Sequence, residues 1–173
     1  GALGVLPMVL AGLLVSQSQA ADPSGAAKAY FAGGCFWCME EVFEKVPGVT
    51  AVVSGYMGGR VEHPSYEQVS AGGTGHAESV EVVYDPTKAS YTTLLDAFWH
   101  NVDPVTPNAQ FCDHGSQYRS VIFYQGEEQK RLAEESKRAI EQSQRLTQPI
   151  VTELTKASQF YPAEEYHQDF YKK

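Results

Sequence analysis

The sequence has few cysteines, few positively charged residues and no hydrophobic run long enough to span a membrane. Its 173 residues include three cysteines, and 13 Lys and Arg stand against 21 Asp and Glu, for a formal net charge of −8. Lys and Arg cluster nowhere, which argues against binding to nucleic acid or anionic lipid. Three cysteines cannot all pair within one chain, so a scaffold in which every cysteine is paired is excluded. We expect a small or neutral partner and a thiol that is free or cycling.

The main apolar run, residues 3–15, has the length of the hydrophobic part of an export signal and is too short to cross a bilayer. Ser18-Gln19-Ala20 offers a small-x-small cleavage site before Ala21. We predict a signal peptide over 1–20 and a single domain over 21–173. The mature protein is then periplasmic or secreted and has no membrane anchor. The alternative is a disordered or anchoring N-terminal segment.

Hydrophobic spacing predicts four strands and four helices in the domain. Strands are expected over 28–32, 49–56, 76–84 and 119–124, and helices over 36–46, from Tyr66, over 91–99 and over 127–144. The helix from Tyr66 is expected because Ser65, with Gln68 three residues on, has the form of a capping box. The order strand, helix, strand, strand, helix, strand is that of a split βαβ unit. We predict an α/β (α+β) two-layer sandwich with a ferredoxin-like core. It should have a mixed sheet, helices on one face and a long loop-rich C-terminal part.

Cys35 follows a Gly-Gly turn at the end of the first predicted strand and opens the first predicted helix. Unpaired N–H groups and the helix dipole can stabilise a thiolate at such a position, which suits a nucleophile. Gly33 and Gly34 would allow another molecule to approach closely. The alternative is a buried, inert thiol. Cys38 follows at the spacing of a Cys-x-x-Cys pair, and the aperiodic segment 102–117 has the length of a functional loop.

Seven short motifs follow one another along 27–124. They are Gly34-Cys35-Phe36-Trp37, Gly55-Tyr56-Met57-Gly58-Gly59, Pro64-Ser65-Tyr66, Gly75-His76-Ala77-Glu78, Tyr84-Asp85-Pro86, Phe98-Trp99 and Asp113-His114-Gly115-Ser116-Gln117-Tyr118-Arg119-Ser120. Tyr161-Pro162-Ala163-Glu164 comes after them. In this order they resemble the peptide methionine sulfoxide reductase A family. The resemblance implies thiol-dependent reduction of methionine S-sulfoxide, free or in peptides, as repair of oxidised protein.

The resemblance implies that Cys35 attacks the sulfoxide sulfur while Glu78 donates a proton to the oxygen. A proton is needed because an unprotonated oxide is a poor leaving group, and the acid needs a pKa raised by burial among aromatic rings. From its position in an alternating strand alone, Glu78 would instead face solvent.

Five further side chains receive roles from the resemblance. The hydroxyls of Tyr66 and Tyr118 would hold the sulfoxide oxygen, and Asp113 would complete the hydrogen-bond network. Phe36 and Trp37 would form an apolar wall for the S-methyl group. Without the resemblance, the tyrosines and Trp37 would be ordinary core residues.

Oxygen transfer would leave Cys35 as a sulfenic acid, which must condense with a second thiol. Many members of the family use cysteines in a C-terminal tail, whereas this chain has none after Cys112. Cys38 is favoured as the resolving cysteine because of its helical spacing, and Cys112, beside Asp113, is the alternative. A thioredoxin-like protein is the implied reductant, and a monomer is expected.

Two other classes of function fit part of the sequence. A thioredoxin-like oxidoreductase would also place Cys35 and Cys38 at a helix start, but it leaves the later motifs unexplained. A zinc-binding module could draw on Cys35, Cys38, Cys112 and His114, although no second Cys-x-x-Cys is present. We therefore expect neither a metal nor a cofactor.

Overall fold

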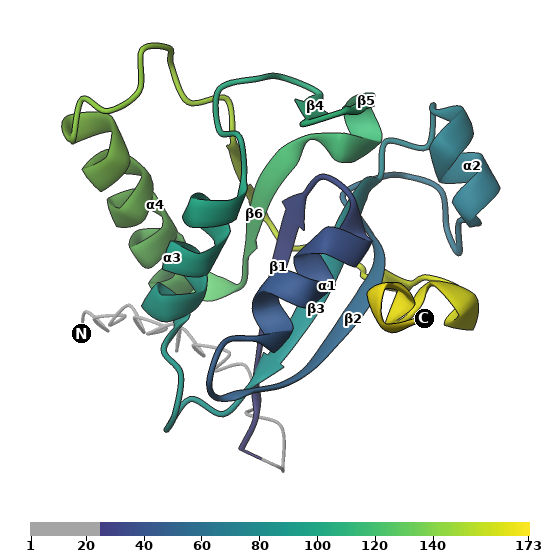
Figure 1. Ribbon diagram of the computed structural model, residues 1–173, viewed down its shortest axis with the longest axis horizontal. Coiled ribbons are helices and arrows are strands. Elements are labelled where there is room, and N and C mark those ends of the chain that lie inside the picture. The colour runs from purple at the N-terminus through teal and green to yellow at the C-terminus, as the bar shows by residue number, and fades with distance from the viewer. Residues whose placement is uncertain (1–24) are drawn as a thin grey trace, which may run out of the picture.

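The computed structural model describes residues 25–173, which form a six-stranded sheet with α1, α3 and α4 packed on one face (Figure 1). The helices are α1 (Phe36–Glu44), α2 (Tyr66–Ala71), α3 (Tyr91–Asn101) and α4 (Gly126–Gln142), with 3₁₀ helices η1 (Ser116–Tyr118), η2 (Glu165–His167) and η3 (Phe170–Lys172). The strands are β1 (Ala27–Gly33), β2 (Val49–Met57), β3 (Ala77–Tyr84), β4 (Ala109–Gln110), β5 (Asp113–His114), β6 (Ser120–Tyr124), β7 (Glu153–Lys156) and β8 (Tyr161–Pro162). The predicted signal peptide, 1–20, lies outside the described residues.

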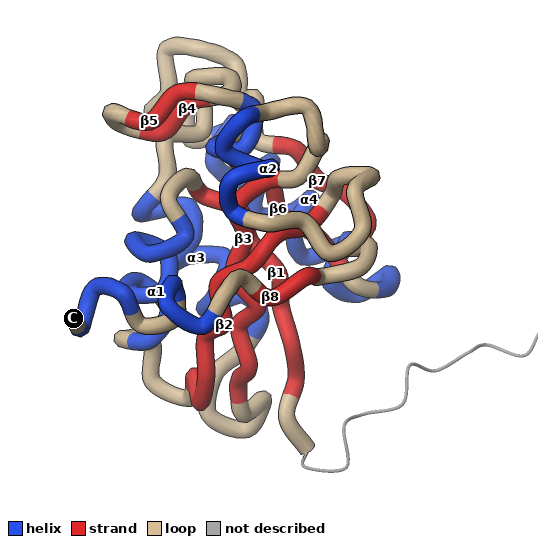
Figure 2. Tube along the Cα trace, turned by 90° about the vertical axis from the view of Figure 1, so that its right-hand side faces the viewer, coloured by secondary structure: helices blue, strands red, loops and turns tan. Residues whose placement is uncertain are grey.

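The centre of the sheet consists of the predicted strands in the order β6-β1-β3-β2. Strand β1 pairs antiparallel with β3 and β6, and β2 pairs antiparallel with β3. This is the pairing of a split βαβ unit, so the predicted sandwich is confirmed. At the edges lie β7, which runs parallel to β6 and makes the sheet mixed, and β8, which pairs with β2 (Figure 2). Neither edge strand was predicted, because four and two residues carry little periodic signal.

Alternation along β1 divides the core into two layers. Phe31 faces the helices and stacks on Phe43 and Phe98, with ring centroids 4.9 and 5.4 Å apart. Tyr30 faces the other side of the sheet, where Phe160 of the C-terminal chain covers it at 5.5 Å. Each such buried side chain stabilises the fold by roughly 1.5–3 kcal/mol. The strand that leads into the first motif is thus held firmly from both sides.

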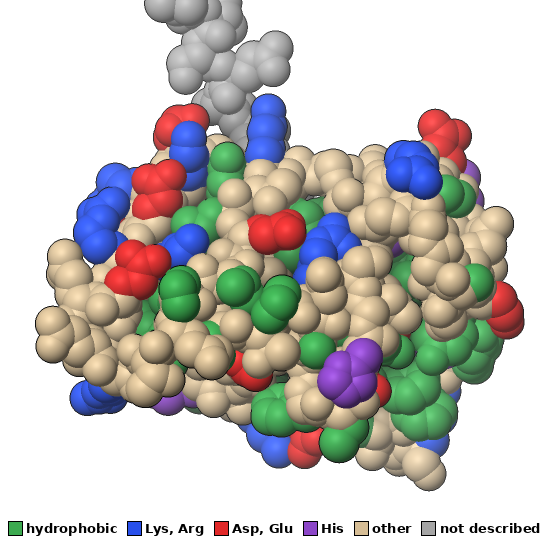
Figure 3. Space-filling model, turned by 90° about the horizontal axis from the view of Figure 1, so that it is seen from above, with side chains coloured by type: hydrophobic (Ala, Val, Ile, Leu, Met, Phe, Trp, Pro, Cys, Tyr) green, Lys and Arg blue, Asp and Glu red, His purple; other side chains and the backbone are tan. Residues whose placement is uncertain are grey.

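The helices begin and end largely as the sequence predicts. The capping box of α2 is present: Gln68 N donates to Ser65 Oγ at 3.2 Å and Ser65 N donates to Gln68 Oε1 at 2.8 Å. Ala133 is the buried residue of the otherwise solvated α4. In the described part of the chain, no helix combines the length and apolarity needed to cross a bilayer. On the face seen in Figure 3, Lys and Arg side chains stand among Asp and Glu side chains.

Candidate active site

Cys35 is the N-cap residue of α1, directly after β1, and is half-buried. Burial raises the pKa of its thiol to about 12, and the nearby Cys38 and Glu78 add to the rise. The backbone N–H groups of Cys38 and Trp37 oppose the rise, as a helix start should. The amides of the helix start thus favour a thiolate as predicted, but desolvation outweighs them, so the pKa of the thiol is raised in the free protein. The resting form is a thiol that must lose its proton during any reaction.

Glu78 lies on β3 beneath the start of α1 and is 2% exposed. Its Oε1 accepts a hydrogen bond from Phe36 N at 3.3 Å. Burial raises the pKa of Glu78 to about 7, and the negative charge of Asp113 raises it further. The Phe36 amide and a hydrogen bond from Tyr118 lower it. The side chain does not face solvent, as alternation alone would have placed it, since both faces of β3 are covered.

Tyr118, in η1, links the remaining polar residues of the site. The pKa of its hydroxyl is raised above the ordinary value by burial and then by Glu78, Tyr66, Asp113 and Cys35. Glu78 lies on β3, Tyr66 on α2, Asp113 on β5 and Cys35 at the start of α1. All four raise the pKa of the one hydroxyl. The structure thus brings together the five polar residues that the resemblance singled out.

An aromatic wall adjoins this polar group. Phe36 is 1% exposed, and its ring lies 5.9 Å from that of Trp37 and 6.4 Å from that of Tyr66. Trp37 and Tyr66 stack at 6.5 Å. The two residues expected to receive a methyl group therefore form one cluster of packed rings with one of the two tyrosines.

All three cysteines border one cavity of about 580 Å³, between α1, the end of α3 and the 102–113 segment. All are free thiols, and Cys38 and Cys112 are exposed. Gly34, with φ +93°, lets the segment close over the site, because a Cβ there would lie 2.5 Å from Gln110 Cβ. The close approach that the glycine allows is thus made by Gln110 of the protein itself, and not by another molecule as expected. Both candidate resolving cysteines therefore face the same space as Cys35.

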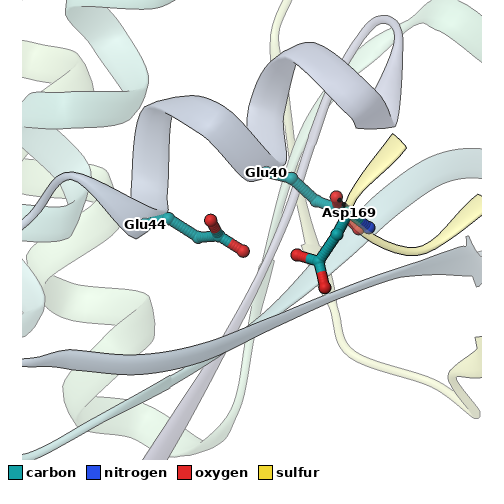
Figure 4. Close-up of side chains that lie close together, drawn as sticks. All are labelled: Glu40, Glu44 and Asp169. Carbon is teal, nitrogen blue, oxygen red and sulfur yellow. Dashed lines mark hydrogen bonds between the residues drawn. The ribbon is translucent and has the colours of Figure 1, made fainter. Parts of the chain in front are cut away.

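The residues considered for a zinc site do not gather as metal ligands. Among the described residues, the ligand-like side chains that converge within 4.8 Å are Glu40, Glu44 and Asp169 (Figure 4). The ammonium group of Lys172 lies 2.8 Å from Glu44 and 3.3 Å from Asp169. A cation of the chain itself thus offsets part of the charge of this cluster, which joins α1 to residues 160–172, the C-terminal segment.

Two residues beside the site were not assigned a role from the sequence. Glu164, quoted above only as part of a motif, accepts a hydrogen bond from Tyr66 N at 3.0 Å. His167 is 2% exposed, and its ring lies 4.4 Å from Tyr66, 5.4 Å from Phe36 and 5.6 Å from Trp37. A lone histidine near the end of a chain carries no signal of such a position.

Comparison with known proteins gives a consistent result. The family described as "Peptide methionine sulfoxide reductase" matches residues 27–173. A peptide methionine sulfoxide reductase MsrA of Listeria innocua is 53% identical over 146 residues, covering 84% of this chain and 82% of that protein. An MsrA of Ligilactobacillus salivarius is 54% identical over 145 residues, covering 84% of each.

Solved structures share the fold. Reduced Mxr1 of Saccharomyces cerevisiae superposes with a TM-score of 0.81 at 29% identity, covering 90% of each chain. Methionine sulfoxide reductase A of Corynebacterium diphtheriae superposes with a TM-score of 0.76 at 33% identity, covering 86% of this chain and 74% of that one. Mxr1 in complex with Trx2 superposes with a TM-score of 0.61 at 22% identity, covering 89% of this chain and 91% of that one.

Proposed function

Because the chain belongs to the peptide methionine sulfoxide reductase family, we propose that it reduces its substrate with the thiol of Cys35 and a proton carried by Glu78. It is a peptide-methionine (S)-S-oxide reductase of the MsrA type. The observation that carries the proposed roles is the burial of the Glu78 carboxyl group beneath the helix start that bears Cys35. A buried carboxyl with a pKa of about 7 can both accept and release a proton near neutral pH.

The proton balance of oxygen transfer fits this pair. A sulfoxide and a thiol give a sulfide and a sulfenic acid, so the one proton of the thiol ends on the transferred oxygen. As Cys35 sulfur attacks the sulfoxide sulfur, Glu78 takes the thiol proton and passes it to the oxygen. The S–S bond so formed and the S–O bond of the substrate then break as the hydroxyl group passes to Cys35 sulfur, which leaves the sulfide and the sulfenic acid. In the active state, the Cys35 thiol and the Glu78 carboxyl therefore share a single proton. When both groups are protonated, one proton must leave before the reaction can begin.

The neighbouring side chains hold the substrate in this scheme. The hydroxyls of Tyr66 and Tyr118 donate to the sulfoxide oxygen, and the rings of Phe36 and Trp37 receive the S-methyl group. Burial keeps the pKa of the Glu78 carboxyl high, and the charge of Asp113 adds to this effect. Methionine S-sulfoxide, free or in peptides, is the substrate.

Regeneration begins when the Cys35 sulfenic acid condenses with the Cys38 thiol, which forms a disulfide and releases water. Their spacing of one helical turn supports this choice, and Cys112 on the same cavity is the alternative. One turnover without reductant, followed by peptide mapping, decides between them. A disulfide between Cys35 and Cys38 is expected, whereas one between Cys35 and Cys112 would contradict this choice.

A thioredoxin-like protein is proposed as the external reductant. The supporting observation is that a yeast relative, Mxr1, has been crystallised with Trx2. Export is proposed from residues 3–20, with a periplasmic or extracellular equivalent of thioredoxin as the donor. Sequencing of exported protein should find Ala21 or a near neighbour at its N-terminus; an intact Gly1 would refute export by signal cleavage.

The activity is tested with racemic methionine sulfoxide and dithiothreitol, with the remaining epimers separated by chirality. Reduced wild-type protein should consume the S epimer alone, and Cys35→Ser should consume neither. No consumption by the reduced wild type would refute the function, and turnover by Cys35→Ser would refute the nucleophile.

A further inference from the structure

The C-terminal segment is tied to the elements that carry the active site by part-buried hydrogen bonds. Glu40 of α1 is fully buried, and its carboxylate accepts from Ser54 Oγ at 2.5 Å and from Asp169 N at 2.9 Å. The Gln168 side chain accepts from Ser54 N at 2.9 Å and donates to Ser54 O at 3.0 Å. Helix α1, strand β2 and the segment are thus joined into one unit.

Within this unit, Glu164 reaches the first residue of α2. Its Oε1 accepts from Tyr66 N at 3.0 Å, and its Oε2 accepts from the Tyr56 hydroxyl at 3.4 Å. The first N–H groups of a helix have no partner inside the helix, so their orientation depends on outside acceptors. Ser65 and Gln68 satisfy their own pair of N–H groups, and the N–H of Tyr66 is left to Glu164. A carboxylate 98 residues away therefore fixes the backbone of Tyr66.

His167 holds the ring of the same tyrosine. It lies between the rings of Tyr66, Phe36 and Trp37, and burial lowers the pKa of its imidazole. Its Nε2 is 3.3 Å from Glu164 Oε2, yet neither ring nitrogen has a hydrogen-bond partner among the described residues. Buried polar atoms without partners reduce stability. Packing, rather than hydrogen bonding, is what this side chain contributes.

We propose that Glu164 and His167 are positioning residues that fix the Tyr66 hydroxyl against the sulfoxide oxygen, so that the C-terminal segment forms a wall of the active site. The inference rests on the proposed role of Tyr66. Glu164 sets the backbone of Tyr66 by one hydrogen bond, and His167 sets its ring by contact. Misplacement of a catalytic group by about 1 Å can lower a rate by roughly 10²-fold.

The first test compares two variants of Glu164 with one variant of its neighbour, Glu165. Each is assayed in the full chain with dithiothreitol as reductant. Glu164→Ala should lower kcat by roughly 10- to 100-fold with KM little changed. Glu164→Gln keeps an acceptor oxygen and should stay within about threefold of wild type. Glu165→Ala is the matched control, because Glu165 is exposed on the same turn. Loss of activity in Glu164→Gln equal to that in Glu164→Ala would overturn positioning by the hydrogen bond.

The second test asks whether the effect passes through the Tyr66 hydroxyl. In a Tyr66→Phe background, Glu164→Ala should add less than about a twofold loss, since the group it positions is gone. A full multiplicative loss would refute the inference and leave the proposed function standing. Unchanged kcat in Tyr66→Phe alone would refute both the role of Tyr66 and this inference. If Glu164→Ala does not fold, Glu164→Asp takes its place, because it keeps the charge and withdraws the oxygen by one methylene.

The third test asks whether the His167 ring acts by packing or by hydrogen bonds of its nitrogens. His167→Ala should lose kcat, and His167→Phe should restore it, because a phenyl ring fills the same space. His167→Phe should also raise Tm, since it removes the unpartnered nitrogens. A His167→Phe variant as slow as His167→Ala would show that the nitrogens are used and would overturn the packing role.

Discussion

Glu78→Gln should make the protein more stable while it destroys the proposed activity. Glu78 is 2% exposed, and burial raises its pKa from 4.5 to about 7. A carboxyl whose pKa is raised in the folded state binds its proton more tightly there than in the unfolded chain. Its stabilising effect is complete below about pH 4.5 and is lost as the pH rises through about 7. Above that pH, the folded protein carries a buried charge.

The magnitude follows from the two pKa values. A pKa difference between 4.5 and about 7 corresponds to about 3 kcal/mol of unfolding free energy at pH 8. Glutamine is neutral at every pH, and its amide oxygen can still accept from Phe36 N. The variant should therefore be more stable than wild type by up to about 3 kcal/mol at pH 8 and by less than about 1 kcal/mol at pH 5.

Urea unfolding of both proteins at pH 5 and pH 8, with the three thiols kept reduced, measures this difference. The sulfoxide reductase rate of the variant should fall by about 10² or more at both pH values, since the group that carries the proton from the thiol to the oxygen is lost. Two results would refute the reasoning. A stability difference independent of pH would show that the buried carboxylate is not the cause, and an unchanged rate would show that Glu78 carries no proton for the reaction.

Four other outcomes follow from the site. Wild-type kcat/KM should rise with pH to about 7 and then level off, because the active pair holds a single proton; a fall through pH 7 would contradict the shared proton. Tyr118→Phe should move the rising part of this pH profile to higher pH, since the hydrogen bond from Tyr118 lowers the pKa of Glu78. An unchanged profile would show that this hydrogen bond is absent. Gly34→Ala should lower Tm by roughly 5 °C or more, because a Cβ meets Gln110 at 2.5 Å with φ at +93°, and an unchanged melting curve would argue against that close approach. Iodoacetamide at pH 8, followed by mass spectrometry, should label the two exposed cysteines well before Cys35, whose thiol has a pKa of about 12; preferential labelling of Cys35 would show a thiolate at rest.

Several features could be predicted from the sequence because they depend on local spacing. The alternation in the strands and the three- and four-residue spacing in the helices predicted the central sheet order, which pairing confirmed. The Ser65 and Gln68 pair predicted a helix start, and the Gly-Gly turn placed Cys35 at another. The ordered motifs indicated the family, to which the chain belongs.

Other features depend on neighbours that are remote in the chain, and tertiary structure decided them. The helix start at Cys35 predicts a lowered thiol pKa, yet burial and the charge of Glu78, brought in on β3, raise it. Alternation places Glu78 at the surface, yet the covering of both faces of β3 buries it. The role we propose for His167 arises because part-buried hydrogen bonds hold the C-terminal segment against α1 and β2. Local spacing sets which elements form, whereas desolvation and electrostatics depend on every group that packing brings near.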